Sequence, residues 1–448
     1  MRKGLRPLSA QSNETGQKEK EAANGVKAAM RFREEFALVE DGAGGAALRA
    51  RPATASVSRG TNQIGVRLYN ERLVLSLVRE NETMPKADIA RLTGLSPQTI
   101  SIIVNQLTDD GLLLKGKPQR GRVGQPSVPY SLNPEGAYFV GMKIGRRSSD
   151  VVLLDFLGRV LRKFHEPHPY STPEGTLALI RRGTTELIET LTDAQRSRIS
   201  GFGIASPFEM WNWEPQFGAP PAVLEAWRNT DILAEAKRVS PWPVYLHNDG
   251  TSACAAELVL GHATTSADFL YIFLGSFIGG GVVLNHALYP GRTGNAGAFG
   301  SMPFGTHNSR PSQLIDHASV VLLEKMLIDD GKDPSSIWLT PEQWDEFGPT
   351  KARWIRETAE ALAFAIVTVC SVIDFEAIVI DGGFAASVRS AIVQAIKTEL
   401  AKLDLQGIAP PVVEEGLVGS AARAIGAASL PLFSRYHIDQ SVLFKDMA

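Results

Sequence analysis

The sequence predicts an α/β protein in which a small helical head with a basic β-hairpin precedes a two-lobed α/β body. Three observations support this fold class. Short amphipathic helices fill residues 67–109 and are followed by a Gly-rich, basic segment. From residue 134 onward, strands and helices alternate in two halves of the same kind. Residues 1–60 are instead rich in Ala, Gly, Ser and charge, which predicts a disordered arm or a misassigned start codon.

Residues 61–133 are the predicted head, whose best-marked helix begins at Ser96. Ser96 can accept a hydrogen bond from a free amide of the first turn, and Pro97 suits the first helical position because it has no amide hydrogen. Apolar residues then recur at i, i+3, i+4 and i+7, which predicts one buried stripe of Ile100, Ile103, Val104 and Leu107. The side facing away carries short polar groups, namely Gln98, Thr99, Ser101 and Asn105.

Two further helices and a hairpin complete the head. Residues 67–81 and 86–93 are predicted helices, and Gly94 follows the second in the usual turn position of a helix-turn-helix. Strand-like residues 112–115 and 127–132 enclose a loop that is basic and free of acidic residues. The pattern predicts a winged helix-turn-helix and a double-stranded DNA partner. The expected DNA contacts are Ser96, Gln98, Thr99, Ser101, Asn105, Arg120, Arg122 and Gln125. The alternative is a small structural or dimerisation domain.

Charge is unevenly distributed along the 448 residues, whose formal net charge is −2. Residues 1–60 carry 11 basic and 7 acidic side chains, residues 61–133 carry 9 and 6, and residues 134–448 carry 26 and 35. The basic part therefore coincides with the predicted DNA-binding head. An acidic body should be repelled by the duplex, so we expect only the N-terminal part to contact DNA.

Cysteine content and hydropathy exclude several protein classes. Only Cys254 and Cys370 are present, without further Cys or His at ligand spacing, so neither a zinc site nor a disulfide framework is predicted. The longest apolar run spans 13 residues between Glu360 and Asp374, which is too short to cross a bilayer. The N-terminus lacks the apolar segment of a secretory signal. A cytoplasmic protein without membrane contact is predicted.

The body, residues 134–448, begins with three strand-like runs and continues with alternating helices and strands. This order suits two lobes with a ligand bound in the cleft between them. The predicted strands are residues 138–144, 150–155, 159–164, 201–205, 244–246, 269–274, 281–284 and 377–380, and the predicted helices are residues 173–191, 252–260 and 350–373.

Residues 66–430 resemble the ROK family of bacterial repressors and sugar kinases, which has an actin-like, ribonuclease-H-like fold. The resemblance rests on the order and spacing of short motifs at residues 121–126 (GRVGQP), 132–136 (LNPEG), 248–249 (ND) with 255–257 (AAE), 275–281 (GSFIGGG), 294–297 (GNAG) and 381–383 (DGG). Members with an N-terminal winged helix include the N-acetylglucosamine and xylose repressors. The resemblance implies transcription control by a sugar or a sugar derivative.

The resemblance also reveals departures from the kinase pattern. Family kinases carry Asp, two Gly and Thr in the first turn, which cradles phosphate and metal. Here Lys143, Gly145, Arg146 and Arg147 stand there, so a cation replaces the metal-holding carboxylate. Phe277 occupies the second phosphate loop, where it would obstruct a nucleotide.

Asp249 matches the catalytic base of the family kinases, but a base alone supplies only about 10²- to 10⁴-fold acceleration. We therefore expect no enzymatic activity and no cofactor, with Asp249 as a relict position. Two interpretations of Arg146 and Arg147 stay open: an anion-binding pair or a solvated turn.

The sugar and zinc positions depart from the family as well. The resemblance places a sugar-binding Glu and a His where this chain has Ala298 and Ser301, and a zinc-binding Cys where it has Gln313, so no metal is expected. His307 and His317 are expected on the surface. A loop at residues 206–221 holds Trp211 and Trp213, which either cover the cleft or simply pack, whereas Trp227 is expected in the core. Ligand contacts are expected from Asn248, Asp249, Gly294 and Asn295.

The leading functional hypothesis is a DNA-binding transcriptional regulator, a repressor of carbohydrate metabolism genes, that responds to a sugar-like effector. A homodimer or homotetramer would present two recognition helices to a pseudo-palindromic operator. One alternative is a sugar kinase that carries a DNA-binding domain. The other is a DNA-binding dimer that no longer responds to a ligand.

Overall fold

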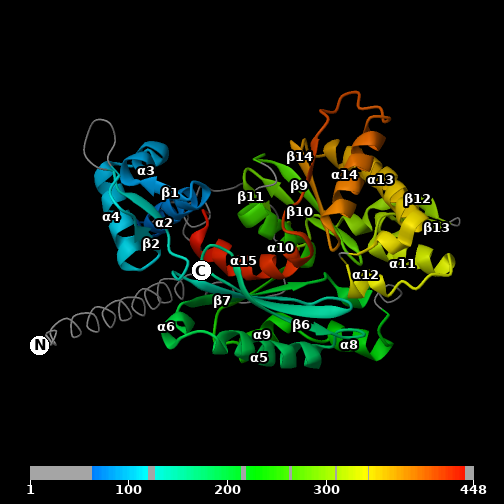
Figure 1. Cartoon of the computed structure of the whole chain (residues 1–448), viewed down its shortest axis with the longest axis horizontal. Helices are drawn as coiled ribbons and strands as arrows, with labels where there is room; N and C mark the ends of the chain where they lie inside the picture. Colours follow the sequence, from blue (N-terminus) through cyan, green and yellow to red (C-terminus); the bar gives the residue numbers. More distant parts are fainter. Residues whose placement is uncertain are drawn as a thin grey trace, which may run out of the picture.

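The computed structural model describes residues 63–119, 127–212, 218–261, 265–307, 310–341 and 343–438. It confirms the predicted fold class, because a winged helix-turn-helix head stands at one end of a two-lobed α/β body (Figure 1). The arm predicted at residues 1–60 lies outside the described residues. No helix in the described parts of the chain combines the length and the apolar composition needed to cross a membrane.

The head contains three helices and a small antiparallel sheet: α2 (Gln63–Glu80), β1 (Thr83–Pro85), α3 (Lys86–Thr93), α4 (Pro97–Asp109), β2 (Leu113–Lys115) and β3 (Pro129–Leu132). The sheet order is β1-β3-β2. The predicted apolar stripe of α4 is buried against the other helices. The sequence analysis missed β1, which pairs with β3 and buries Met84 at 4% exposure. Three residues are too few to show an alternating pattern.

The first lobe is a five-stranded mixed sheet with helices, in chain order β4 (Tyr138–Lys143), β5 (Ser148–Leu154), β6 (Val160–Pro167), α5 (Pro173–Glu189), α6 (Asp193–Arg196), β7 (Ile199–Ser206), η1 (Met210–Asn212), α8 (Pro221–Arg228), α9 (Ile232–Val239) and β8 (Val244–Asn248). The sheet order is β6-β5-β4-β7-β8, and the pairs of β7 are parallel. Helices α5, α8 and α9 pack on one face (Figure 1). Every residue of β4 and β7 is buried, as expected of central strands covered on both faces.

The second lobe has the same kind of sheet, with the order β11-β10-β9-β14-β15. Helices α11, α13 and α14 form the core on one face (Figure 1). Its strands are β9 (Phe269–Leu274), β10 (Ile278–Leu284), β11 (Ala287–Tyr289), β14 (Ala377–Gly382) and β15 (Val412–Glu415), with a separate pair β12 (Pro303–His307) and β13 (Arg310–Gln313). Its helices are α11 (Val320–Asp329), α12 (Ser336–Leu339), α13 (Gly348–Cys370) and α14 (Ala386–Leu400), with short 3-10 turns η3 (Phe299–Ser301), η4 (Leu314–Asp316) and η5 (Asp345–Phe347).

Two helices lie between the lobes: α10 (Asp249–Ala256), which continues as the π-helical turn η2 (Glu257–Gly261), and α15 (Ala422–Tyr436) after the turn η6 (Gly419–Ala421) (Figure 1). They approach each other and the first sheet very closely. A Cβ atom on Gly203 would lie 1.7 Å from the carbonyl oxygen of Ala427, and one on Gly426 would lie 1.7 Å from that of Ser252. Any larger residue at either glycine would force the layers apart.

The head and the body share one hydrophobic core. Side chains of α2, α4 and β3 pack in a single cluster with Phe156, Val259 and Tyr436 of the body. Across the same junction, Arg79 donates a hydrogen bond to the carbonyl oxygen of Phe156 at 2.8 Å and lies over its ring. The backbone N–H of Ile438, just beyond α15, donates to the Ser76 hydroxyl at 3.3 Å. The head is therefore packed onto the body rather than only tethered to it.

Candidate nucleic-acid interface and ligand cavity

Helix α4 presents a free face to solvent. Gln98 and Asn105 are exposed, and Ile102 between them is 64% exposed. These three residues are spaced i, i+4 and i+7, so they lie on one face of the helix, opposite its buried stripe. The sequence analysis missed Ile102, although its exposure follows from the same helical periodicity. An exposed isoleucine among amide side chains can contact thymine methyl groups beside hydrogen-bonded base edges.

Asn105 and the remaining polar residues expected on α4 also make hydrogen bonds within the head. The Ser96 hydroxyl accepts from the backbone N–H of Thr99 at 3.1 Å and bonds the Thr99 hydroxyl at 2.8 Å, which makes the pair an N-cap. Lys86, at the start of α3, donates to Asn105 Oδ1 at 2.7 Å and to Ser101 Oγ at 3.2 Å. Burial lowers the pKa of Lys86. No pattern in the sequence singles out Lys86, which orients two expected DNA contacts.

The wing is described only in part. Gln119 and Ser127 form a bridge with backbone hydrogen bonds in both directions, which closes the base of the hairpin. Lys115 and Lys117 are exposed on it. The expected contacts Arg120, Arg122 and Gln125 lie outside the described residues, so their role stays a prediction.

A cavity of about 530 Å³ opens between the two lobes. It is lined by the loop after β4, the segment after β7, the start of α10, the β9–β10 turn, the segment before η3, and α15. Its polar and charged lining residues are Arg146, Glu209, Asn212, Asn248, Asp249, Ser276, Asn295, Ser301, Gln313 and Arg423. Because both lobes contribute, a bound ligand would contact both at once.

Three of the four residues expected to bind ligand lie in this cavity. Asn248, Asp249 and Asn295 line it, whereas Gly294 does not. Gly294 has a φ of 73° and open space around its Cβ position, so it serves the turn that precedes Asn295. Asn248 also has a structural role, since its Oδ1 accepts from the backbone N–H groups of Gly250 and Thr251 and caps α10.

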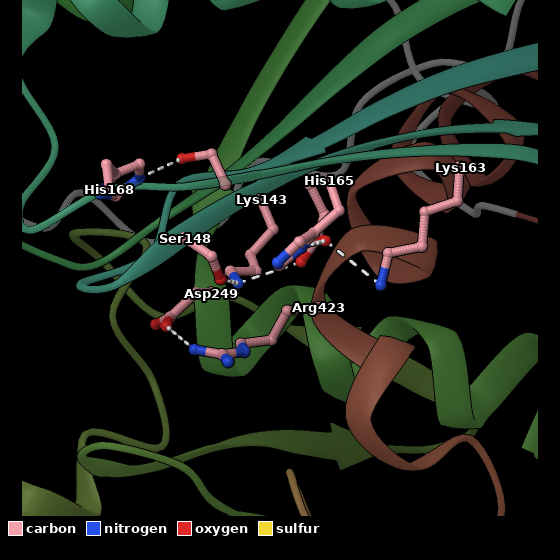
Figure 2. Close-up of polar contacts among 9 residues, drawn as sticks. Lys143, Ser148, Lys163, His165, His168, Asp249 and Arg423 are labelled. Carbon is pink, nitrogen blue, oxygen red and sulfur yellow. Dashed lines mark hydrogen bonds and ion pairs between the residues drawn. The ribbon is translucent and has the colours of Figure 1, made fainter. Parts of the chain in front are cut away.

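Asp249, the position of the relict base, is paired with a residue that the sequence analysis missed. Arg423 Nη1 lies 3.5 Å from Asp249 Oδ2, as Figure 2 shows. The Arg423 guanidinium also lies over the ring of Phe273, 5.0 Å from its centroid. The two partners are 174 residues apart in the chain, and only the return of α15 between the lobes brings them together. No local pattern in the sequence could have indicated this pair.

Lys143 stands at the end of β4, where the resemblance implied a metal-binding carboxylate. Its amine donates to Asp150 Oδ2 at 3.1 Å and to Ser148 Oγ at 3.2 Å (Figure 2). The lysine is buried, and burial together with nearby Arg423 lowers its pKa to about 8. Lys163 and His165 also contact Asp150, and the surrounding cations hold the pKa of this carboxyl far below its usual range despite burial. Three basic side chains thus surround Asp150 beside the end of β4.

Arg146 and Arg147 share one carboxylate. Each lies 3.6 Å from an oxygen of Glu324 on α11, but their exposure differs, with the Arg146 side chain 11% exposed and that of Arg147 45% exposed. Only Arg146 lines the cavity. Burial lowers the pKa of Arg146, although Glu324 opposes the shift. The interpretation of a solvated turn is therefore wrong for Arg146, because the second lobe folds over it.

Among the described residues, the aromatic side chains that line the cavity are phenylalanines. The loop after β7 contributes Phe208, while Trp211 packs partly buried against the core of the first lobe. Trp213 lies outside the described residues. Phe277 lines the cavity, in the second phosphate loop. Trp227 is a core residue, as expected, and donates to the carbonyl oxygen of Ser171 at 3.0 Å.

The former zinc loop is filled by other contacts. His317 is partly buried, packs on the ring of Phe304 and bonds the Ser312 hydroxyl at 3.0 Å, so its expected surface position is wrong. The side chain of His307 lies outside the described part. Within the described residues, no three His, Cys, Asp or Glu side chains are grouped as a metal site requires.

Comparison with known proteins matches residues 139–313 to the ROK family and residues 67–113 to the winged helix-turn-helix DNA-binding family. The chain is 24% identical to the xylose repressor of Bacillus subtilis over 241 residues, which cover 54% of this chain and 62% of the repressor. It is 23% identical to the N-acetylglucosamine repressor of Escherichia coli O157:H7 over 249 residues, covering 54% and 60%. These alignments thus span less than two thirds of either repressor.

Solved structures share the fold. A ROK family transcriptional regulator described as a homologue of the E. coli Mlc protein superposes with a TM-score of 0.62 at 21% identity, covering 83% of this chain and 97% of that one. A ROK family glucokinase from Streptomyces griseus, in complex with glucose and AMPPNP, superposes with a TM-score of 0.53 at 20% identity, covering 66% and 99%. The transcriptional regulator therefore matches a larger share of this chain than the glucokinase does.

Proposed function

The chain joins a winged helix-turn-helix to a domain of the ROK family, and we propose that it is a transcriptional repressor whose hold on DNA changes when a sugar-like effector enters the interlobe cavity. The observation that carries the proposal is the combination of a free recognition-helix face with a ligand-sized cavity in one packed molecule. Relatives named as xylose and N-acetylglucosamine repressors support it. A protein with this role works in the cytoplasm.

For DNA binding, we propose that α4 enters the major groove and that Gln98, Ile102 and Asn105 contact bases. Ser96 and Thr99 fix the start of the helix, and the wing adds phosphate contacts through its basic residues, including Arg120 and Arg122. The chain works as a homodimer or a homotetramer, because two recognition helices are needed to fill a pseudo-palindromic operator.

For the effector, we propose that polar groups from both lobes close on the ligand. Asn248 and Asp249 belong to the first lobe and the start of α10, and Asn295 belongs to the second lobe. Ligand binding then favours one relative orientation of the lobes. Helix α15 carries this change to α2, because it contacts the cavity through Arg423 and the head through the segment that ends at Ile438.

We also propose that the cleft transfers no phosphoryl group. Phosphoryl transfer depends on metal and amide groups that stabilise negative charge, and here Lys143 and Asp150 fill the metal position with an ion pair. Asp249 is paired with Arg423 rather than free to take a proton from a substrate. The second candidate, a sugar kinase, is favoured only by the retained Asp249 and by the fold shared with the glucokinase.

The test is a gel-shift and footprinting experiment with the full chain and the region upstream of its own gene. We expect a specific complex whose affinity falls steeply with salt, and a footprint with two-fold symmetry. Gln98→Ala should weaken operator binding about 5- to 100-fold, the loss that corresponds to about 1–3 kcal/mol for a base contact. It should leave binding to random DNA unchanged.

Matched controls separate the parts of the proposal. Gln394→Ala removes an exposed amide from α14 in the second lobe, far from α4 in sequence, and should leave operator binding unchanged. Arg122→Ala should weaken binding to operator and random DNA alike, since phosphate contacts carry no sequence information. Retention that is independent of salt, or ATP turnover with a sugar and Mg²⁺ that Asp249→Asn abolishes, contradicts the proposed function.

A further inference from the structure

We propose that the interlobe cavity takes an anionic carbohydrate, a monosaccharide that carries a phosphate or a carboxylate group, and that the Arg146 guanidinium holds the anion with support from Arg423. The inference rests on the proposed function, because it names the chemical class of the effector for the same cavity. It depends on how the charged groups around the cavity are already paired with one another.

Arg146 has hydrogen-bonding capacity that its neighbours do not use. Its Nε and Nη1 atoms are buried and find no hydrogen-bond acceptor among the described residues. The contact of Nη1 with Glu324, at 3.6 Å, is too long for a hydrogen bond. A guanidinium offers five N–H groups in a fixed planar fork, which matches the oxygens of a phosphate or a carboxylate. Because Arg146 lines the cavity, this unused donor capacity lies beside the space that a ligand would fill.

Glu324, the only acid described against Arg146, is shared among several donors. It contacts both Arg146 and Arg147, and its Oε1 also accepts a weak hydrogen bond from Trp338 Nε1 at 3.4 Å. One carboxylate therefore faces two guanidinium groups, and this cluster keeps a net positive charge. Nearby, Asp150 faces the ammonium groups of both Lys143 and Lys163, so that cluster is positive as well.

The two acids that line the cavity, Glu209 and Asp249, each have a partner of their own. The Glu209 carboxylate accepts from Asn212 Nδ2 at 2.7 Å, and Asp249 faces Arg423. Arg423 keeps one further donor, since its buried Nε has no hydrogen-bond partner within the described chain. The start of α10 is not available as an alternative anion site, because Asn248 already caps its first amides. The cationic side chains that line the cavity and have unpaired buried donors are therefore Arg146 and Arg423.

The remaining lining suits the neutral part of a sugar. Asn295, Ser276, Ser301 and Gln313 offer neutral hydrogen-bonding groups from the second lobe, and Phe208 offers an apolar ring from the first. A volume of about 530 Å³ accommodates a monosaccharide with one charged substituent. An anion drawn to Arg146 on the first lobe, with hydroxyl groups held by the second, would bridge the lobes.

The test compares neutral and charged sugars on the full chain by isothermal titration calorimetry and thermal shift. The panel contains glucose and N-acetylglucosamine, their 6-phosphates, gluconate, glucuronate and inorganic phosphate. At least one charged sugar should bind and raise the melting temperature, and its neutral counterpart should bind at least about 10-fold more weakly, the ratio expected when one charge-assisted contact is lost. The phosphates and the sugar acids distinguish the two kinds of anion.

Three variants locate the anion. Arg146→Gln should weaken binding of the charged sugar about 10- to 100-fold and leave the neutral sugar unaffected. Arg147→Gln is the matched control, because this neighbour contacts the same Glu324 but does not line the cavity. The affinity of this variant for the charged sugar should stay within about 3-fold of that of the native chain. Glu324→Gln should bind the charged sugar more tightly than the native chain, a gain that a loss of folding would not produce.

Three outcomes of these measurements would contradict an anionic effector. Equal affinity for neutral and charged sugars, unchanged anion binding in Arg146→Gln, or no binding by any charged member would overturn the inference. Operator binding is measured without ligand and is therefore independent of the effector. If the chain binds the charged sugar but not the operator, the proposed repressor is contradicted and the cavity assignment is not. Release of DNA by a neutral sugar, with no response to charged sugars, would support the proposed repressor and contradict the anionic effector.

Discussion

At the scale of single residues, the end of β4 beside the cavity is held together by buried ion pairs. Lys143 is buried, and Asp150 is its acidic partner at 3.1 Å. A buried pair of this kind adds little net stability when intact, because both charges lose their hydration, but the loss of one partner leaves an uncompensated charge. The cluster therefore makes the body sensitive to pH.

We predict that Asp150→Asn lowers the free energy of unfolding by about 3–5 kcal/mol at neutral pH, the cost of stranding a buried charge. The pKa of Lys143 is about 8 in the folded protein against an ordinary value of 10.5. Between these values the unfolded chain binds the proton that the folded protein has released, so stability rises with pH across this window. In the variant, the rise of stability with pH should begin at a lower pH, because the carboxylate that raises the pKa of Lys143 has been removed.

Urea unfolding at several pH values from 7 to about 10 checks this prediction. Asp193→Asn is the control, because its side chain is fully exposed and its pairing with Arg196 lies on the surface. It should show no change in midpoint and no change in pH dependence. A variant of Asp150 as stable as the native chain at neutral pH would mean that water reaches Lys143 and replaces its partner.

At the scale of elements, α4 divides its residues between packing and recognition by helical geometry alone. Its 13 residues bury Ile100, Ile103, Val104 and Leu107 and turn Gln98, Ile102 and Asn105 outward. An isoleucine that is 64% exposed contributes little to the stability of the head. Its exposure is explained if the side chain becomes buried against DNA.

We predict that Ile102 contacts the methyl group of a thymine in the operator. Replacing that thymine by uracil should weaken binding about 4-fold, the effect of about 0.8 kcal/mol for one buried methyl-sized group. In Ile102→Ala the same replacement should have no effect, because the partner of the methyl group has been removed. Binding to duplexes with single uracils, measured by fluorescence anisotropy, gives the four affinities of this cycle.

Leu114→Ala is the matched control, since Leu114 is 45% exposed on β2 of the same head. It should leave the sensitivity to uracil as it is in the native chain. If no thymine in the footprint responds to the loss of its methyl group, or if Ile102→Ala responds as the native chain does, the contact does not exist.

At the scale of the whole molecule, α15 joins the cavity to the head. Arg423 near its start lines the cavity, and Tyr436 at its end packs edge-on against Phe139 and Phe156 beneath α2. These ends are about 20 Å apart at 1.5 Å per residue. Glycines at positions 203 and 426 let the helix contact β7 and α10 without intervening side chains, so it is packed tightly between them.

We predict that Arg79→Met uncouples the head from the body. The change removes the hydrogen bond to the Phe156 carbonyl and leaves that buried acceptor unpaired, at a cost of about 1–3 kcal/mol. Operator affinity without effector should stay within about 3-fold, because α4 is untouched. The ratio of operator affinities with and without effector should fall toward one.

Gel shifts at saturating effector check this prediction. Arg238→Met, which removes an exposed ion pair with Glu235 on α9, should keep the ratio of the native chain. A full response to effector in Arg79→Met would mean that the signal does not pass through the contact between α2 and Phe156.

The sequence by itself determined the elements whose signals are local. Ser96 and Pro97 marked the start of α4, Gly94 marked the preceding turn, and the alternation of strands and helices indicated a two-lobed body. Strand β9 was predicted to the residue, because six consecutive apolar or aromatic residues lie between Asp268 and Gly275. The substitutions at Lys143 and Phe277 also indicated a cleft that had lost its nucleotide pattern.

Only the tertiary structure decided which charges meet. Arg423 reaches Asp249 because α15 returns between the lobes, and Glu324 reaches Arg146 because α11 of the second lobe lies against the first. Hydrophobic periodicity reports which face of a helix is buried but not which distant element covers it. The spacing of charged residues likewise does not indicate a partner on a distant element. The fold class could therefore be predicted from local patterns, whereas the chemistry of the cavity depends on contacts between residues far apart in the chain.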